Sequence, residues 1–416
     1  THQQLQLDQS AALYNMRLVL AAAFLCLAVA VPRVRQIQNL SNSNRIQGEF
    51  LVVLHPPFAR TSNVKYASDV ADKIAQISSK VTIVKKFTHL KAPIFLIRTS
   101  EESTVSSLFQ LDEVDIIEAN SIEKDVTKQC SSQNTGSRLW GLSRISSVPL
   151  PNFNTAQFSY GSGDGAGVRV YILDTGIRLT HNDFGGRAEF GFNTIGGDDN
   201  DNQGHGTHCA GTAVGGEFGV AKAATVVAVK VLGDDGAGTL DSIIDGIDLS
   251  VGDIQSRGVR GVISMSLGLV GTSSALDSAV ASADSANIPA VAAAGNSNTN
   301  ACNSSPSREP SAITVGATDI TDQLWIASSW GSCVNILAPG ADILSASHLS
   351  DTGSIVDSGT SMATPLVSGV IAKYLSANPN ASTSQVKSFL TSTATSNAID
   401  LRGTSGTPNL LLYSSC

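Results

Sequence analysis

Charged side chains, aromatic side chains and long apolar runs are all scarce in this sequence. Only 15% of the 416 residues are charged and 5% are aromatic, while 42% are hydrophobic. This is the composition of a globular chain, and its length is ample for two domains. The longest apolar run, Leu18 to Val31, is shorter than the roughly 20 residues that a membrane span needs. We therefore expect no membrane anchor.

Cysteine is also rare, with six in the whole chain. Cys26 lies inside the apolar run, and the others are Cys130, Cys209, Cys302, Cys333 and Cys416. Because those five are an odd number, one thiol has no partner within the chain. This usage supports an extracellular location without making disulfides the main framework of the fold.

Positive charge is short in the C-terminal part. Residues 31–132 carry 13 lysines and arginines against 11 acidic residues (13 − 11 = +2), whereas residues 133–416 carry 13 against 23 (13 − 23 = −10). An acidic body of this kind argues against nucleic acid and anionic membranes as partners. The mildly basic segment is compatible with docking on the acidic one.

The apolar run has the features of a secretory signal peptide. Met16 and Arg17 precede it, and the small residues Ala28-Val29-Ala30 close it before Pro32. We interpret residues 16–30 as a signal peptide and residues 1–15 as leader sequence upstream of the true start. The expected location is secreted and extracellular.

Residues 46–121 have the pattern of a small α+β domain. Strand-like runs at 49–54, 81–87, 93–98 and 114–119 alternate with helical patterns at 67–77 and 101–111. The order βαββαβ predicts a ferredoxin-like sandwich. The polar stretch 122–138 lacks apolar periodicity, so we interpret it as a linker and cleavage region.

The larger domain, residues 139–416, alternates short apolar runs with helical patterns. The runs lie at 168–173, 225–231, 259–265, 288–294 and 312–315, and helical spacing is clear from Leu240 to Ile254. This pattern predicts an α/β fold with a mostly parallel sheet and helices on both faces. In such sheets the active groups gather at the carboxyl ends of strands.

Three polar residues in this domain have the types and order of a nucleophilic triad. Asp174 follows a predicted strand, His205 lies among glycines where a helix begins, and Ser361 lies in a small-residue turn that enters another helix. Each also has an ordinary explanation, namely an Asx turn, a buried histidine and a helix cap. Together they supply a nucleophile, a general base and a carboxylate that orients the base.

The segments around these residues resemble those of subtilisin-like serine proteases, most closely the secreted proteinase K-like branch. The similarity runs from about Leu139 to Leu390, and the N-terminal sandwich is similar to the family's inhibitory, chaperoning propeptide. The matching segments are Asp174-Thr175-Gly176, Gly204-His205-Gly206-Thr207-His208-Cys209-Ala210-Gly211, Ser266-Leu267-Gly268, Ala293-Ala294-Gly295-Asn296 and Gly359-Thr360-Ser361-Met362-Ala363-Thr364-Pro365.

The resemblance implies a role for each matching residue. Asp174, His205 and Ser361 would be the catalytic triad, and Asn296 would donate to the oxyanion. A polypeptide substrate would lie as a strand between two segments, and small residues would wall a pocket for a large apolar or aromatic side chain. The substrate-binding residues would be Gly233, Ser266, Leu267, Gly268, Ala293, Ala294 and Gly295. Leu269 stands where these enzymes usually have glycine.

The implied protein is a monomeric serine endopeptidase of broad specificity. It would act on proteins or peptides and would be made as a zymogen that its own propeptide inhibits. It would cut itself between Asn120 and Gln133.

The resemblance also bears on metals and disulfides. The chemistry needs no metal, but relatives build a structural calcium site from two backbone carbonyls and an aspartate, here matched by Pro310, Ala312 and Asn335. A neutral amide at the third position binds calcium less strongly. We interpret the acidic loop from Asp198 to Asp201 as a solvated run of charge.

Cys302 and Cys333 match a disulfide found in some relatives. Cys130 and Cys416 then remain as a second pair, and Cys209 remains free. Cys209 follows His205 by four residues, so both lie on one helix face and the thiol should lie beneath the imidazole.

Three other functions fit less well. A zinc hydrolase would need His205 and His208 within H-E-x-x-H, which is absent. An α/β-hydrolase needs its histidine after the serine, but the last histidine, His348, precedes Ser361. A binding scaffold with a decayed protease fold would have lost at least one catalytic group. All four predicted groups are present, namely Asp174, His205, Asn296 and Ser361.

Overall fold

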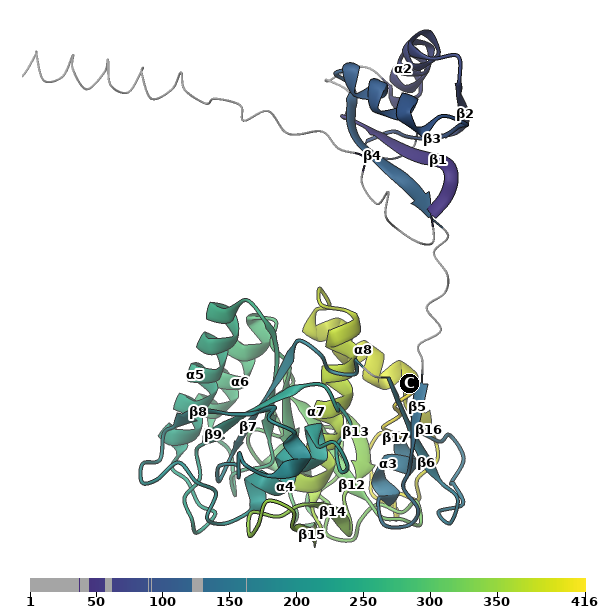
Figure 1. Ribbon diagram of the computed structural model, residues 1–416. Helices are drawn as coiled ribbons and strands as arrows, with labels where there is room; N and C mark the ends of the chain where they lie inside the picture. The colour runs from purple at the N-terminus through teal and green to yellow at the C-terminus, as the bar shows by residue number, and fades with distance from the viewer. Residues whose placement is uncertain are drawn as a thin grey trace, which may run out of the picture. The chain divides into compact units, whose positions relative to one another are not determined.

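The computed structural model describes residues 37, 45–56, 62–88, 90, 92–121, 130–161 and 163–416. The predicted signal peptide and most of the predicted cleavage region lie outside the described residues. The chain forms two compact units, Thr1–Thr127 and Lys128–Cys416 (Figure 1). Within the described ranges, no helix is both long enough and apolar enough to cross a membrane.

The smaller unit has one antiparallel sheet with the strand order β2-β3-β1-β4. Its elements are β1 (Arg45–Leu54), α2 (Asn63–Ile77), β2 (Val81–Phe87), β3 (Ile94–Thr99), the 3-10 helix η1 (Glu102–Gln110) and β4 (Val114–Ser121). Alternation along β1 buries Phe50, Val52 and Leu54, which pack in one core with Val70 and Ile74 of α2. This is the arrangement that the order βαββαβ predicts.

The second predicted helix of this unit is a 3-10 helix rather than an α-helix. Its buried residues, Val105 and Leu108, are three apart, so both face the core when the helix has three residues per turn. Serine and threonine occupy four of its nine positions, and Ser107 Oγ donates to the Thr104 carbonyl oxygen at 2.6 Å. Such hydroxyls compete for the backbone groups that an α-helix would use.

The larger unit is built on a nine-stranded sheet, in which every neighbouring pair is parallel except β16 and β17. In spatial order the strands are β16 (Thr395–Ser396), β17 (Leu410–Leu411), β13 (Ile336–Pro339), β12 (Ile313–Thr318), β11 (Ala290–Ala293), β10 (Arg260–Met265), β7 (Val168–Asp174), β9 (Thr225–Lys230) and β8 (Ala188–Asn193). The mostly parallel sheet is therefore confirmed.

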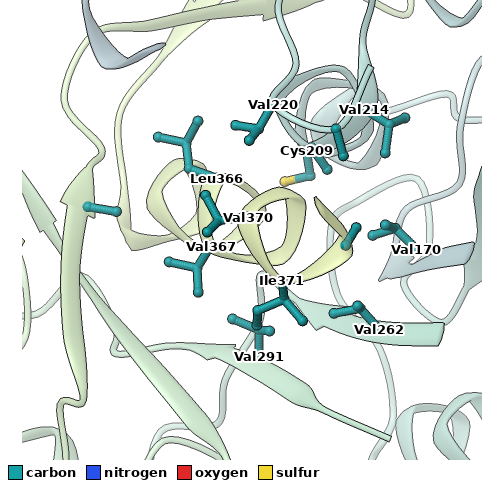
Figure 2. Packing of buried hydrophobic residues seen from close by; sticks show 14 of the residues in the cluster. Val170, Cys209, Val214, Val220, Val262, Val291, Leu366, Val367, Val370 and Ile371 are labelled. Atoms are coloured by element: carbon teal, nitrogen blue, oxygen red, sulfur yellow. The ribbon is translucent and has the colours of Figure 1, made fainter. Parts of the chain in front are cut away.

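Helices cover both faces of this sheet (Figure 1). Along β7, Val170 and Ile172 enter the core shared with α4 (His205–Val214) and α7 (Thr360–Ala377), whereas Tyr171 and Leu173 enter the core shared with α5 (Leu240–Arg257) and α6 (Ser274–Ser285). Figure 2 shows α7 surrounded by its own apolar side chains, by sheet residues and by residues of α4. The remaining helices are α3 (Trp140–Ile145), η2 (Asn182–Phe184), η3 (Ala301–Asn303) and α8 (Thr383–Thr393).

The larger unit begins earlier than the sequence predicts. Within the stretch interpreted as a linker, β5 (Cys130–Asn134) pairs with β6 (Gln157–Gly161), and Cys130 is bonded to Cys416. Strand β5 is polar because its side chains are largely exposed, and backbone pairing and the disulfide hold it instead of apolar contacts. A second hairpin joins β14 (Ile343–Ala346) to β15 (Ser354–Asp357), and a second disulfide joins Cys302 to Cys333.

Candidate active site

The three predicted triad residues lie on elements that meet at the carboxyl edge of the sheet. Asp174 is the last residue of β7, His205 is the first residue of α4 and Ser361 is the second residue of α7. Helix α4 can begin at His205 because Gly204 has φ 105°, a left-handed conformation, and a Cβ there would collide with the His348 ring.

Asp174 and His205 form a close pair. His205 Nδ1 lies 2.8 Å from Asp174 Oδ1 and 2.9 Å from Oδ2, and the carboxylate is fully buried while the imidazole is 22% exposed. Because a carboxylate only accepts hydrogen bonds, Nδ1 carries the proton. Nε2 is therefore left as a proton acceptor.

The pair has a marked effect on acidity. Burial alone would lower the pKa of His205, but the charge of Asp174 and its hydrogen bond outweigh burial, so this pKa lies well above its ordinary value. Burial raises the pKa of the Cys209 thiol. A protonated thiol is a poor nucleophile, which leaves Ser361 as the candidate nucleophile.

Ser361 is tied to the segment that follows β10. Its Oγ donates to the Ser266 carbonyl oxygen at 3.1 Å, and Ser266 Oγ donates to the Ser361 carbonyl oxygen at 2.8 Å. In the described part of the chain no hydrogen bond joins Ser361 Oγ to His205, so attack requires the hydroxyl to rotate. Catalytic hydrogen bonds are often formed only when substrate is bound.

Asn296 is oriented by α7. Its Oδ1 accepts from Thr360 N at 2.8 Å and from Thr360 Oγ1 at 2.9 Å, so Oδ1 faces the helix start and Nδ2 is directed elsewhere. A Cβ added to Gly359, two residues before Ser361, would lie 3.2 Å from Nδ2. The amide donor therefore lies close to the nucleophile segment, where an oxyanion would form.

A cleft of about 430 Å³ opens beside Ser361 and Asn296. Its lining includes six predicted substrate-binding residues, which are Ser266, Leu267, Gly268, Ala293, Ala294 and Gly295. A second cleft of about 410 Å³ lies beside His205 and shares the segment from Ser266 to Val270. None of the described residues that line the first cleft is charged.

Two predictions about the cleft rim need refinement. Gly233 does not line either cleft; it lies in the turn that places Gly236 and Gly238 in the second one. Leu269 lines both clefts, and its N–H donates to the Ser305 carbonyl oxygen at 2.9 Å. Its side chain packs against the core of α5 and α6, so the leucine is anchored.

Cys209 lies beneath the imidazole, as its spacing predicts. Its sulfur is 4.0 Å from His205 Nδ1 and 3.5 Å from the Ser361 carbonyl oxygen, and Figure 2 shows it between α4 and α7. Asp174, His205 and Cys209 offer ligand atoms within 4.8 Å of one another, the kind of set that can hold a metal ion. The carboxylate and imidazole of that set are already hydrogen-bonded to each other.

Sequence patterns miss the residues that support the site. Thr360 orients Asn296, a role that was not predicted from the sequence. Its position next to Ser361 was the one feature that could have indicated this role. Asp201 is 6% exposed rather than solvated, which corrects the interpretation of the acidic loop for this residue. Backbone N–H groups of the loop donate to its carboxylate, and a count of charged residues in the sequence cannot reveal such donors.

Comparison with known proteins agrees with this geometry. The model of the subtilase family matches residues 165–409. The alkaline serine exoprotease A of Vibrio alginolyticus is 42% identical over 305 residues, which are 72% of this chain and 55% of that protein. The extracellular serine proteinase of a Thermus strain is 46% identical over 276 residues, 66% of this chain and 65% of that protein. The chain thus spans between about half and two thirds of these two relatives.

Two further matches cover their proteins almost entirely. The cuticle-degrading serine protease of Arthrobotrys oligospora is 33% identical over 410 residues, 95% of this chain and 97% of that protein. The crystal structure of a cold adapted subtilisin-like serine proteinase matches with a TM-score of 0.62 and 42% identity, over 68% of this chain and all of that one. The predicted subtilisin-like fold is confirmed, and the chain belongs to the subtilase family.

Proposed function

We propose that this protein is a secreted serine endopeptidase that cleaves peptide bonds through an acyl-enzyme. The observation that carries the proposal is the buried Asp174 carboxylate held 2.8 Å and 2.9 Å from His205 Nδ1, beside a cleft that Ser361 and Asn296 line. The relative named an extracellular serine proteinase supports the same activity and location.

The pair of Asp174 and His205 prepares the nucleophile. With Nδ1 protonated, Nε2 accepts the Ser361 proton as Oγ attacks the substrate carbonyl, and the resulting imidazolium is stabilised by Asp174. His205 then returns the proton to the departing amine, which leaves an acyl group on Ser361. Water activated in the same way releases the acyl group.

Asn296 lowers the barrier of both acyl steps. Its Oδ1 is occupied by Thr360, so Nδ2 can donate to the oxyanion together with the backbone N–H of Ser361. Because Thr360 fixes the amide before substrate arrives, little reorganisation accompanies the reaction.

Backbone pairing selects the substrate more than side chains do. The extended segment from Ser266 to Val270 lies between the two clefts and can pair with a polypeptide strand. Small residues wall the cleft beside Ser361, and no charge lines it. We infer broad specificity with a preference for apolar or aromatic residues before the cleaved bond.

The smaller unit acts as an inhibitory and chaperoning propeptide of a monomeric enzyme. The ferredoxin-like order of its strands supports this role, and β5 places the start of the larger unit by Cys130. We infer self-cleavage between Asn120 and Gln133, and the pairing of β5 from Cys130 onward supports a bond before that residue.

We also infer that the position implied for calcium holds no ion. The Pro310 carbonyl oxygen accepts from Lys387 Nζ at 3.2 Å, and Asn335 Oδ1 accepts from Thr314 N at 2.7 Å. The Lys387 ammonium thus faces one expected ligand, the Pro310 carbonyl oxygen, and the Thr314 N–H occupies another, Asn335 Oδ1. These residues therefore do not fit a calcium ion.

Maturation of the purified precursor tests the function. Wild-type chain should release the smaller unit and then hydrolyse a peptide with a phenylalanine before the scissile bond, and a sulfonyl fluoride should label Ser361. Ser361→Ala should remain full length and inactive. Processing of pure Ser361→Ala at the same bond, or hydrolysis by it, would contradict the proposal.

A further inference from the structure

Asp201 is a buried carboxylate that the triad mechanism does not use. It lies in the loop between β8 and α4, and it is 6% exposed although its neighbours Asp198, Asp199 and Asn200 are exposed. A buried carboxylate is costly unless its oxygens are fully hydrogen-bonded. Its contacts therefore indicate what it does.

Five donors surround the Asp201 carboxylate. Oδ1 accepts from Thr175 Oγ1 at 2.8 Å, from Gly204 N at 2.7 Å and from Gln203 N at 3.2 Å. Oδ2 accepts from Thr207 N at 2.9 Å and from Thr207 Oγ1. One carboxylate thus joins the residue after Asp174 to the residues on both sides of His205.

Thr175 carries this connection further. Its Oγ1 donates to Asp201 and accepts from Gly206 N at 3.0 Å, while its own N–H donates to Asp174 Oδ1 at 2.8 Å. The end of β7 and the first turn of α4 are therefore held together by a second set of bonds behind the Asp174–His205 pair. Helix α4 has no side-chain cap at Gly204, so other side chains satisfy its first N–H groups: Gln203 Oε1 accepts from His205 N, Thr175 Oγ1 from Gly206 N and Asp201 Oδ2 from Thr207 N.

Lys230 holds the same segments from another direction. It is 2% exposed, and its Nζ donates to the Thr175 carbonyl oxygen at 2.7 Å and to the Asn200 carbonyl oxygen at 3.1 Å. The residues after Asp174 and before Asp201 are thus fixed by an ammonium as well as by a carboxylate. This arrangement leaves the loop little freedom to move relative to β7.

We propose that Asp201 is a positioning residue of the triad, acting through Thr175 and the first turn of α4 to hold His205 against Asp174. This inference rests on the proposed hydrolase function. Because all five partners donate, the site requires a group that only accepts. An asparagine amide would turn its NH2 toward either the Gly204 N–H or the Thr207 N–H, and neither backbone group can reverse its role.

Asp201→Asn tests the proposal, and Asp199→Asn is the matched control because it removes the same charge from an exposed side chain of the same loop. For Asp201→Asn, kcat should fall about 10- to 100-fold with KM changed less than about threefold, since a displacement of 1 Å can cost that much rate. The acid limb of the pH profile of kcat/KM should move to lower pH, and the downfield proton resonance of His205 Nδ1–H should shift upfield. A structural role alone would move neither of the last two readouts.

Thr175 supplies a second route if Asp201→Asn does not fold. Thr175→Val removes the bridging hydroxyl at nearly constant volume and should reproduce the shift in pH profile, whereas Thr175→Ser should restore the wild-type profile. The proposal is overturned if folded Asp201→Asn keeps the wild-type kcat, pH profile and resonance, or if Thr175→Val behaves like Thr175→Ser. If wild-type enzyme itself neither hydrolyses peptides nor reacts with a sulfonyl fluoride, the proposed function fails instead.

Discussion

The two units of the chain place their charges differently. In the smaller unit, every ion pair among the described residues includes a side chain that is at least 45% exposed. In the larger unit, Asp174, Asp201 and Lys230 are each at most 6% exposed and lie close together at one edge of the sheet. Each of these ion pairs in the smaller unit thus keeps one partner at the surface, whereas the larger unit also holds several charged side chains in its interior.

This difference predicts that the apolar core of the smaller unit determines its stability, whereas the buried charges of the larger unit affect its reaction. Exposed pairs contribute about 0 to 1 kcal/mol each, so the smaller unit depends on its apolar core for stability. Buried charges carry a desolvation cost and are retained where their orientation matters. The comparison therefore predicts that substitutions at the buried charges change the reaction, whereas substitutions in the small core change stability alone.

Asp174→Asn should lower activity more than substitutions at Asn296 or Cys209. Loss of the carboxylate should lower kcat by about 10^4, a value known for this type of triad rather than derived from this structure. The charge of Asp174 raises the pKa of His205, and only the neutral imidazole accepts the serine proton, so activity in the wild type falls below a pH above the ordinary histidine value. Without that charge, burial remains and the acid limb should move to lower pH. Initial rates across the pH range measure both effects, and an unmoved limb would contradict this assignment.

Asn296→Ala should have an intermediate effect. Removal of one oxyanion donor costs about 10^2- to 10^3-fold in kcat, with little change in KM because the interaction strengthens in the transition state. Thr360→Val, which removes the hydroxyl that orients the amide but keeps the amide, should cost less. Steady-state kinetics on one peptide compares the three enzymes, and a raised KM at constant kcat would assign Asn296 to ground-state binding.

Ile74→Ala should leave the chemistry unchanged and weaken the smaller unit. Ile74 is fully buried, and truncation of such a side chain costs about 2 to 5 kcal/mol. In a Ser361→Ala background that keeps the chain whole, amide hydrogen exchange in β1 and β3 should accelerate while exchange in β7 and β10 stays constant. Val64→Ala, on the same helix but 60% exposed, is the control and should change stability by about 0.5 kcal/mol or less.

Cys209→Ala should affect catalysis less than the substitutions at Asp174 and Asn296. The thiol is buried and protonated and is not the proposed nucleophile, so its loss should leave kcat within about fivefold of wild type, which corresponds to about 1 kcal/mol. A mercurial should inhibit the wild type by displacing His205, and the variant should be insensitive. An inactive Cys209→Ala together with an active Ser361→Ala would replace the serine mechanism by a cysteine mechanism.

The effect of calcium on thermal stability tests the position formed by Pro310 and Asn335. In the wild type, Lys387 and Thr314 donate to the groups expected to bind the ion, so we expect no calcium-dependent thermal stability from this position. The double variant Lys387→Met with Asn335→Asp should gain such calcium dependence. Thermal unfolding with calcium and with a chelator compares the two proteins. No gain of calcium dependence in the double variant would show that the position differs from that of relatives in more than these two residues.

Much of the fold follows from the sequence because buried strands and amphipathic helices leave a periodic signal. The run from Val168 to Leu173 and the spacing from Leu240 to Ile254 correspond to β7 and α5. Strand β5 escapes such reasoning because backbone pairing needs no apolar side chains. The helix predicted at 101–111 is present as η1, but the pattern does not predict its 3-10 period. The periodicity of apolar residues predicts which segments are buried by apolar contacts, but it does not predict which segments are held in place by hydrogen bonds.

The site divides in the same way. Asp174, His205 and Ser361 are found because their order and glycine-rich surroundings are distinctive. Asp201 is misjudged because it is one acid among several, and only the fold distinguishes the one whose carboxylate reaches Thr175 and Thr207. Supporting residues become visible when segments distant in sequence are brought together.

The bond between Cys130 and Cys416 has a consequence for the lifetime of the enzyme. The disulfide fastens β5 to the segment that follows β17, and Lys373 further anchors that segment through Ser414 and Ser415. A protease in solution is also a substrate for its own copies, and loose ends are where digestion starts most readily. Because the disulfide prevents these two segments from fraying apart, digestion of the proposed protease by its own copies is disfavoured there, and its lifetime depends more on the least stable loop elsewhere.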